Sequence, residues 1–182
     1  MRIAIVIAIL LPVLAGCSPS NAETPGSEDW AGDQAEGLEY KRALLALLLR
    51  SNRIVASEHS SEFDLFDAQT GESMIPETII YGIHEFSEAD VKYFIATVQS
   101  LDPTTQDAFS ACVPVVHHTI RFYSGERLID TMEICFECSQ VLWSGTRATP
   151  PWSLYSGLAK VVSHVGFTPD RDWPKVAKQH LK

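Results

Sequence analysis

Cysteine and histidine side chains gather in the second half of this 182-residue chain, at Cys112, His117, His118, Cys135 and Cys138. Thiolates and imidazoles are the ligands of zinc and copper sites, and paired thiols form structural disulfides or redox couples. Cys135 and Cys138 have the two-residue spacing found in both metal and redox motifs, and a single pair does not distinguish between them. Any chemistry of this chain is therefore expected in this segment.

The sequence leaves three interpretations of this segment open. The first is a structural disulfide with one spare buried thiol. The second is a zinc or copper site formed by Cys112, His117, Cys135 and Cys138. The third is a thiol-redox protein that uses Cys135 and Cys138. Ser139 stands where a c-type haem motif needs histidine, which excludes haem attachment. The structural disulfide is the favoured interpretation, and it requires no cofactor.

Motifs typical of enzymes are missing from the sequence, which has no G-x-S-x-G elbow, no phosphate-binding glycine loop and no H-E-x-x-H pair. Asp64 and Asp67 flank an expected turn and are interpreted as solvated loop residues. The formal charge of −9, from 14 basic and 23 acidic residues, disfavours binding to nucleic acid. We therefore expect a non-enzymatic protein.

Two β-rich runs, 115–123 and 128–136, flank a turn signal at Gly125 and predict a β-hairpin. With the turn at Gly125, a regular register forms three cross-strand pairs: Ser124 with Arg127, Arg121 with Asp130, and His118 with Glu133. This register predicts His118 on the surface beside Glu133. His117 then points to the opposite face and is expected as a hydrogen-bonded core residue.

The same register brings the chain at Cys112 back beside the chain at Cys138. The two residues nominally point to opposite faces, but a bulge near the end of the ladder would turn one side chain over. We therefore predict a Cys112–Cys138 disulfide that closes a loop of about 26 residues, with Cys135 left as a buried thiol.

Helices and further strands are expected around this hairpin. Apolar residues recur with helical spacing in three segments, and Ser87 is the expected N-cap of the second. The expected helices are 38–50, 87–100, 151–165 and one further turn within 170–182, and the expected strands beside the hairpin are 63–66, 78–83 and 141–143. They predict an α+β domain, a small and mainly antiparallel sheet with a central β-hairpin packed by about three helices.

The first seventeen residues carry targeting information. Arg2 precedes an apolar run that is shorter than the roughly 20 residues a membrane-spanning helix needs, as in a signal peptide. Residues Leu14 to Cys17 resemble the bacterial lipobox, which implies cleavage before Cys17 and attachment of lipid to its thiol. We therefore expect a lipoprotein signal peptide at 1–16, a lipidated N-terminus and flexible tether at 17–36, and a single domain at 37–182.

Two further stretches behind this signal resemble a family of uncharacterised bacterial lipoproteins, namely the sequence HHTIRFY at 117–123 and ICFEC at 134–138, with Cys112 upstream. The resemblance implies a lipid anchor and brings no known activity. Ser18 stands where an aspartate retains such lipoproteins in the inner membrane. We therefore expect the chain to sit on the periplasmic face of the outer membrane, in a binding or envelope-associated role toward an envelope protein or a small ligand.

Overall fold

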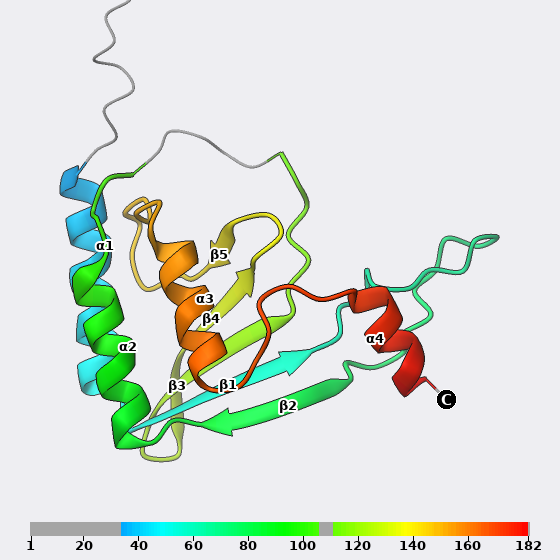
Figure 1. Cartoon of the computed structure of the whole chain (residues 1–182), viewed down its shortest axis with the longest axis horizontal. Coiled ribbons are helices and arrows are strands. Elements are labelled where there is room, and N and C mark those ends of the chain that lie inside the picture. The colour runs from blue at the N-terminus through cyan, green and yellow to red at the C-terminus, as the bar shows by residue number, and fades with distance from the viewer. Residues whose placement is uncertain (1–33, 106–110, 182) are drawn as a thin grey trace, which may run out of the picture.

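The computed structural model describes residues 34–105 and 111–181 and shows an α+β fold (Figure 1). In chain order its elements are α1 (Gln34–Arg50), β1 (Arg53–His59), β2 (Ile80–Glu85), α2 (Glu88–Ser100), β3 (His118–Ser124), β4 (Arg127–Cys135), β5 (Gln140–Leu142), α3 (Leu154–His164) and α4 (Trp173–His180). The expected signal peptide and the lipidation site at Cys17 lie outside the described residues. Within these residues, no helix combines the length and apolarity needed to cross a membrane.

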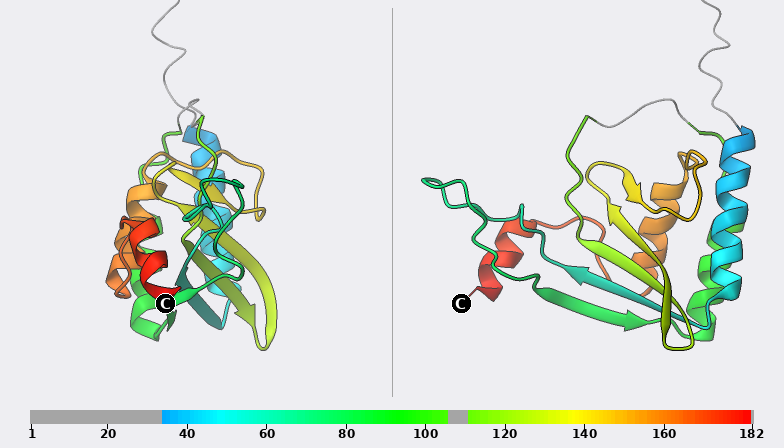
Figure 2. Two further views of the ribbon diagram at one scale, coloured as in Figure 1. Left: turned by 90° about the vertical axis from the view of Figure 1, so that its right-hand side faces the viewer. Right: turned by 180° about the vertical axis from the view of Figure 1, so that it is seen from behind.

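The strands form one open antiparallel sheet in the order β2-β1-β3-β4-β5. Helices α1, α2 and α3 cover one face of this sheet, and α4 packs at the opposite end of the long axis from α1 (Figures 1 and 2). β3 and β4 are joined by a tight turn in which Gly125 has a φ of 61°, a left-handed value that glycine adopts without steric cost. The predicted fold class, with its hairpin inside a small antiparallel sheet, is confirmed.

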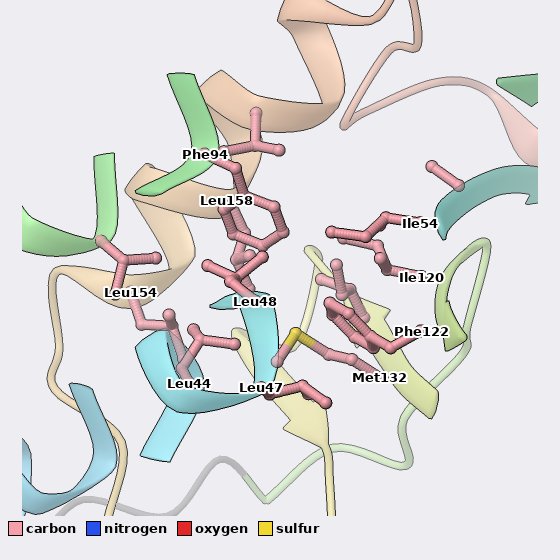
Figure 3. Packing of buried hydrophobic residues seen from close by; sticks show 14 of the residues in the cluster. Leu44, Leu47, Leu48, Ile54, Phe94, Ile120, Phe122, Met132, Leu154 and Leu158 are labelled. Atoms are coloured by element: carbon pink, nitrogen blue, oxygen red, sulfur yellow. The ribbon is translucent and has the colours of Figure 1, made fainter. Parts of the chain in front are cut away.

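The core lies between the sheet and the three covering helices (Figure 3). Alternate residues of β1, β3 and β4 point into it, as expected for strands with one buried face. Leucines of α1 meet this layer, and Phe94 of α2 packs beside them. The largest fully buried apolar side chains on the sheet are Ile54, Ile120, Phe122, Met132 and Ile134.

A β-bulge in the hairpin corrects the predicted register. The pair of Ser124 with Arg127 is present, but Ile129 is an extra residue in β4, so Phe122 rather than Arg121 lies opposite Asp130. Beyond this bulge every pair is shifted by one residue, so Met132 and Ile134 share a face with Ile120 and His118. The predicted pairs of Arg121 with Asp130 and of His118 with Glu133 are therefore wrong.

β1 was not predicted from the sequence, and the strand predicted at 63–66 is wrong. β1 lies between β2 and β3 and makes the sheet continuous. The sequence does not reveal this strand, because the charged Glu58 occupies a position where the alternating pattern of a half-buried strand calls for an apolar residue. Residues 63–66 form no strand and contribute only an isolated bridge between Phe66 and Ser73.

The helices lie close to their predicted positions, with differences at their ends. α1 begins at Gln34, three residues before the expected domain boundary, and the Glu36 carboxylate accepts a hydrogen bond from the Thr149 backbone N–H at 2.9 Å. The end of the expected tether therefore belongs to the folded domain. Ser87 caps α2 as predicted, in a capping box with Asp90. The C-terminal tail forms two turns of helix rather than one, starting after the N-cap Asp172.

Candidate functional site

Cys112 and Cys138 form the expected disulfide, and their Cα atoms lie 5.9 Å apart. Cys112 is exposed and Cys138 is buried. Cys135 is a free, buried cysteine at the end of β4, as expected. The backbone N–H of Cys138 donates to Sγ of Cys135 at 3.4 Å, so all three cysteines meet at one turn.

The expected metal ligands are engaged in other interactions. Two of the four, Cys112 and Cys138, are joined to each other, and His117 binds a carboxylate. In the described part of the chain, no group of three or more histidine, cysteine or acidic side chains has a geometry that could hold a metal ion. A sulfur in a disulfide is not a thiolate ligand, so the zinc or copper site stays a prediction that concerns the reduced chain.

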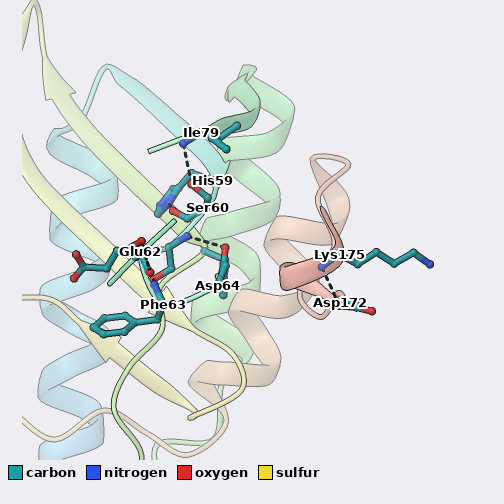
Figure 4. Close-up of polar contacts among 11 residues, drawn as sticks. His59, Ser60, Glu62, Phe63, Asp64, Ile79, Asp172 and Lys175 are labelled. Carbon is teal, nitrogen blue, oxygen red and sulfur yellow. Dashed lines mark hydrogen bonds and ion pairs between the residues drawn. The ribbon is translucent and has the colours of Figure 1, made fainter. Parts of the chain in front are cut away.

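His117 is buried and hydrogen-bonded, as the sequence predicted, but it lies beside α4 and not in the core beneath α1, α2 and α3. Its Nε2–H donates to Oδ1 of Asp64 at 2.7 Å, and both side chains are almost fully buried. The ring stacks on Trp173 with 4.1 Å between centroids and 6° between planes. Asp64 was expected in a solvated loop, which is wrong. Its second oxygen accepts the backbone N–H of Ser61 at 2.9 Å (Figure 4).

His118 is also buried, at 1% exposure, instead of lying on the surface beside Glu133. Its side chain lies on the inner face with those of Ile120 and Phe122, because alternate residues of a strand point to the same face. There its Nε2 lies 3.5 Å from Oε1 of Glu58. Glu58 in turn pairs with Arg171 at 3.2 Å and accepts the backbone N–H of Thr168 at 3.1 Å. Burial first, and then the nearby charges, lower the pKa of His118 from 6.5 to about 3, so the ring is neutral at physiological pH.

His59, His117 and His118 form the histidine cluster. Both ring nitrogens of His59 form hydrogen bonds. Nδ1 lies 2.9 Å from the Ser60 carbonyl oxygen, which can only accept, so Nδ1 carries the proton. Nε2 then accepts from the Thr119 hydroxyl at 2.8 Å. Burial lowers the pKa of His59, and the neutral form matches these two hydrogen bonds.

Helix α4 closes this polar group from outside. Trp173 is buried beneath the helix and contacts both His117 and His118. Tyr81 of β2 stacks on Trp173 with centroids 6.2 Å apart, and burial together with the charge of Asp64 raises the pKa of Tyr81 to about 12. His117 binds Asp64 of the β1–β2 connection, and both His117 and His118 pack against Trp173 of α4. The cluster therefore holds the β1–β2 connection, the start of β3 and α4 together.

The connection from β1 to β2, residues 60–79, projects from this cluster beyond the body of the molecule (Figures 1 and 2). We call it the acidic loop, because it contains five acidic residues and no basic residue. Three large apolar side chains on it are exposed, Phe63 at 44%, Phe66 at 47% and Met74 at 52%. The rings of Phe63 and Phe66 lie 6.1 Å apart, so two of these side chains form one patch.

Hydrogen bonds brace the acidic loop along its length. Oδ1 of Asp67 accepts the backbone N–H groups of Gln69 and Thr70 at the tip, and these bonds lower the pKa of Asp67. The Ser73 hydroxyl donates to the Glu62 carbonyl oxygen at 2.7 Å. At the base, the Ser60 hydroxyl accepts the backbone N–H of Ile79 at 2.8 Å (Figure 4). The exposed rings are thus carried on a defined backbone.

Comparison of the chain with protein-family models, curated proteins and solved structures finds no match. Function is therefore inferred from the residues of the chain itself. Sequence reasoning missed the role of Asp64 and of the acidic loop. The signal available was the combination of two phenylalanines with an all-acidic charge over residues 60–79.

Proposed function

We propose that this chain is a lipid-anchored protein of the bacterial envelope that binds a protein partner through the acidic loop. The resemblance of Leu14–Cys17 to a lipobox supports a lipid anchor, and Ser18 favours the periplasmic face of the outer membrane. The observation that carries the binding role is the exposed pair Phe63 and Phe66 on a braced, projecting loop. Aromatic side chains dominate the energy of protein interfaces, and binding residues are concentrated on loops held by a rigid scaffold.

Charge determines which kind of partner fits this loop. Four of its five carboxylates are exposed on the same loop as the apolar patch: Glu62, Asp67, Glu72 and Glu77. An anionic lipid surface would be repelled by them, whereas a protein surface with an apolar centre and a lysine- or arginine-rich rim is complementary. The loop also lies at the opposite end of the longest axis from α1, into which the tether leads (Figure 1). The loop is therefore far from α1, the first element that the structure describes.

The buried base of the loop lowers the entropic cost of binding. Asp64 fixes the loop to His117, and Trp173 covers this contact. A loop that is already ordered loses little conformational freedom when a partner binds. The histidine cluster therefore acts in binding as a support for the loop and does not itself contact the partner.

Site-specific photo-crosslinking in cells tests this proposal. A photoreactive phenylalanine analogue at Phe66 is expected to give a protein adduct of discrete mass. The same analogue at Leu49, an apolar residue of α1 that is 74% exposed, is the matched control and is expected to give none. Equal adducts at both positions, no adduct at Phe66, or adducts with lipid only would contradict the proposal.

A set of charge variants tests the chemistry of the partner. Changing Glu62, Glu72 and Glu77 to glutamine is expected to reduce the Phe66 adduct about tenfold or more, because it removes charge attraction without cutting the hydrogen bonds of the loop. A control with the same loss of charge elsewhere changes Glu39, Glu126 and Asp170, all exposed. An equal loss in both triple variants would show that net charge, rather than the loop, is responsible.

A further inference from the structure

We propose that the Cys112–Cys138 disulfide exchanges internally with the Cys135 thiol, so that the chain has a second disulfide isomer, Cys135–Cys138, with a free Cys112 thiol at the surface. The inference is independent of the proposed function, because it concerns the three cysteines around the end of β4 and not the aromatic patch of the acidic loop. It identifies Cys112 as a site of modification by external disulfides, which exchange with a free thiol.

The positions of the three cysteines carry this inference. The turn after β4 is closed by a hydrogen bond from the Ser139 N–H to the Phe136 carbonyl oxygen at 3.2 Å. Within this turn the Cys138 N–H donates to the Cys135 sulfur at 3.4 Å. The free sulfur of Cys135 is therefore held against the residue that carries one half of the disulfide.

The two isomers differ in where the free thiol lies. In the observed isomer the free thiol belongs to Cys135, which is 2% exposed. In the second isomer it belongs to Cys112, which is exposed. The observed bond ties the segment before β3 to the end of β4 across a sequence separation of 26 residues, whereas the second bond would close only the local turn. The folded structure carries the Cys112–Cys138 bond, so we take this isomer as the major one. Exchange brings a thiol from the interior to the surface.

The step is an isomerisation that needs no external oxidant or reductant. The thiolate of Cys135 attacks Sγ of Cys138, a new bond forms between these sulfurs, and the bond from Cys138 to Cys112 breaks. The electron pair of the broken bond leaves with Sγ of Cys112. That sulfur takes up a proton from water, which replaces the proton that Cys135 released.

Irreversible alkylation tests the exchange, because it traps whichever thiol reaches the surface. The full chain with Cys17→Ser retains only the three relevant cysteines and is purified without reductant. Iodoacetamide is added to the folded protein at mildly alkaline pH, and non-reducing peptide mapping follows the products over time. We expect Cys112 to be labelled together with a Cys135–Cys138 linkage, at a rate independent of protein concentration.

The control is the same chain with Cys135→Ser, in which Cys112 labelling is expected to fall about tenfold or more because no internal thiol remains to attack. Labelling at Cys135 alone, or at no cysteine, overturns the inference. A rate proportional to protein concentration also overturns it, since that would mean exchange between molecules. The wild-type labelling pattern decides the matter even if the serine variant fails to fold.

Discussion

Asp64 and His117 are 53 residues apart in the chain, yet the carboxylate of one accepts a 2.7 Å hydrogen bond from the ring of the other in the buried interior. This contact joins the acidic loop to the start of β3. A hydrogen bond to a charged group contributes more to stability than a neutral one, and its loss leaves a buried donor without a partner. The same contact therefore affects both the stability of the domain and the order of its projecting loop.

Asp64→Ala is expected to lower the free energy of unfolding by about 1.5–3 kcal/mol. It is also expected to speed amide hydrogen exchange at Ser61, whose N–H the Asp64 carboxylate accepts. Urea denaturation and exchange mass spectrometry measure the two effects. Asp170→Ala, at an exposed acidic residue, is the control and should leave both unchanged. Unaltered stability in Asp64→Ala would show that the contact is not structural.

Acid should weaken the fold through His118. Its pKa is 6.5 in the unfolded chain and about 3 in the folded one, so between these values only the unfolded state binds the proton. The free energy of unfolding is therefore expected to fall as pH drops from about 6.5 toward 3, by up to about 1.4 kcal/mol per pH unit from this group. The charged or titratable groups that face His118 are Glu58, His59, His117 and Arg171.

Urea denaturation at a series of pH values measures this dependence. His118→Gln is expected to flatten the slope, and a smaller slope should remain because burial also lowers the pKa of His59. His180→Gln, at an exposed histidine of α4, is the matched control and should keep the full slope. Parallel pH profiles for the wild type and His118→Gln would contradict the assignment.

Gly37→Ala should destabilise the domain although alanine favours helices. An added Cβ at position 37 would lie 1.7 Å from the carbonyl oxygen of Pro103, a backbone atom that cannot swing aside. Overpacking of this kind costs about 1–3 kcal/mol, which exceeds the roughly 1 kcal/mol gained in helix propensity. Thermal unfolding of Gly37→Ala beside Glu39→Ala, an exposed position of the same helix, measures the effect. A melting temperature equal to that of Glu39→Ala would refute this close approach of α1 to Pro103.

Lipid attachment is a separate prediction for Cys17. Cells grown with a fatty-acid analogue should label the wild-type chain and not Cys17→Ser, because only the cysteine thiol can take up the diacylglyceryl group that the lipobox resemblance implies. Fractionation should likewise move the serine variant out of the membrane fraction. Equal labelling of both chains would contradict the proposed lipid anchor.

The sequence alone determines the helix ends and turns that depend only on residues close together in the chain. Ser87 and Asp90 lie three residues apart and form the capping box of α2 without help from the rest of the chain. Gly125 adopts the positive φ that the hairpin turn requires, and the spacing around it fixed the pair of Ser124 with Arg127. Helical periodicity located α1 and α3 to within a few residues for the same reason.

Tertiary structure decided the faces of the sheet and the partners of its polar residues. The bulge at Ile129 places Ile134 rather than Glu133 opposite the buried His118. Asp130 accepts a hydrogen bond from Trp143 at 3.0 Å instead of pairing with Arg121. Glu58 interrupts the apolar alternation of β1, and its burial is explained only by its distant partner Arg171. Burial of Asp64 depends in the same way on His117, because a buried charge is tolerated only where the folded chain brings it a partner.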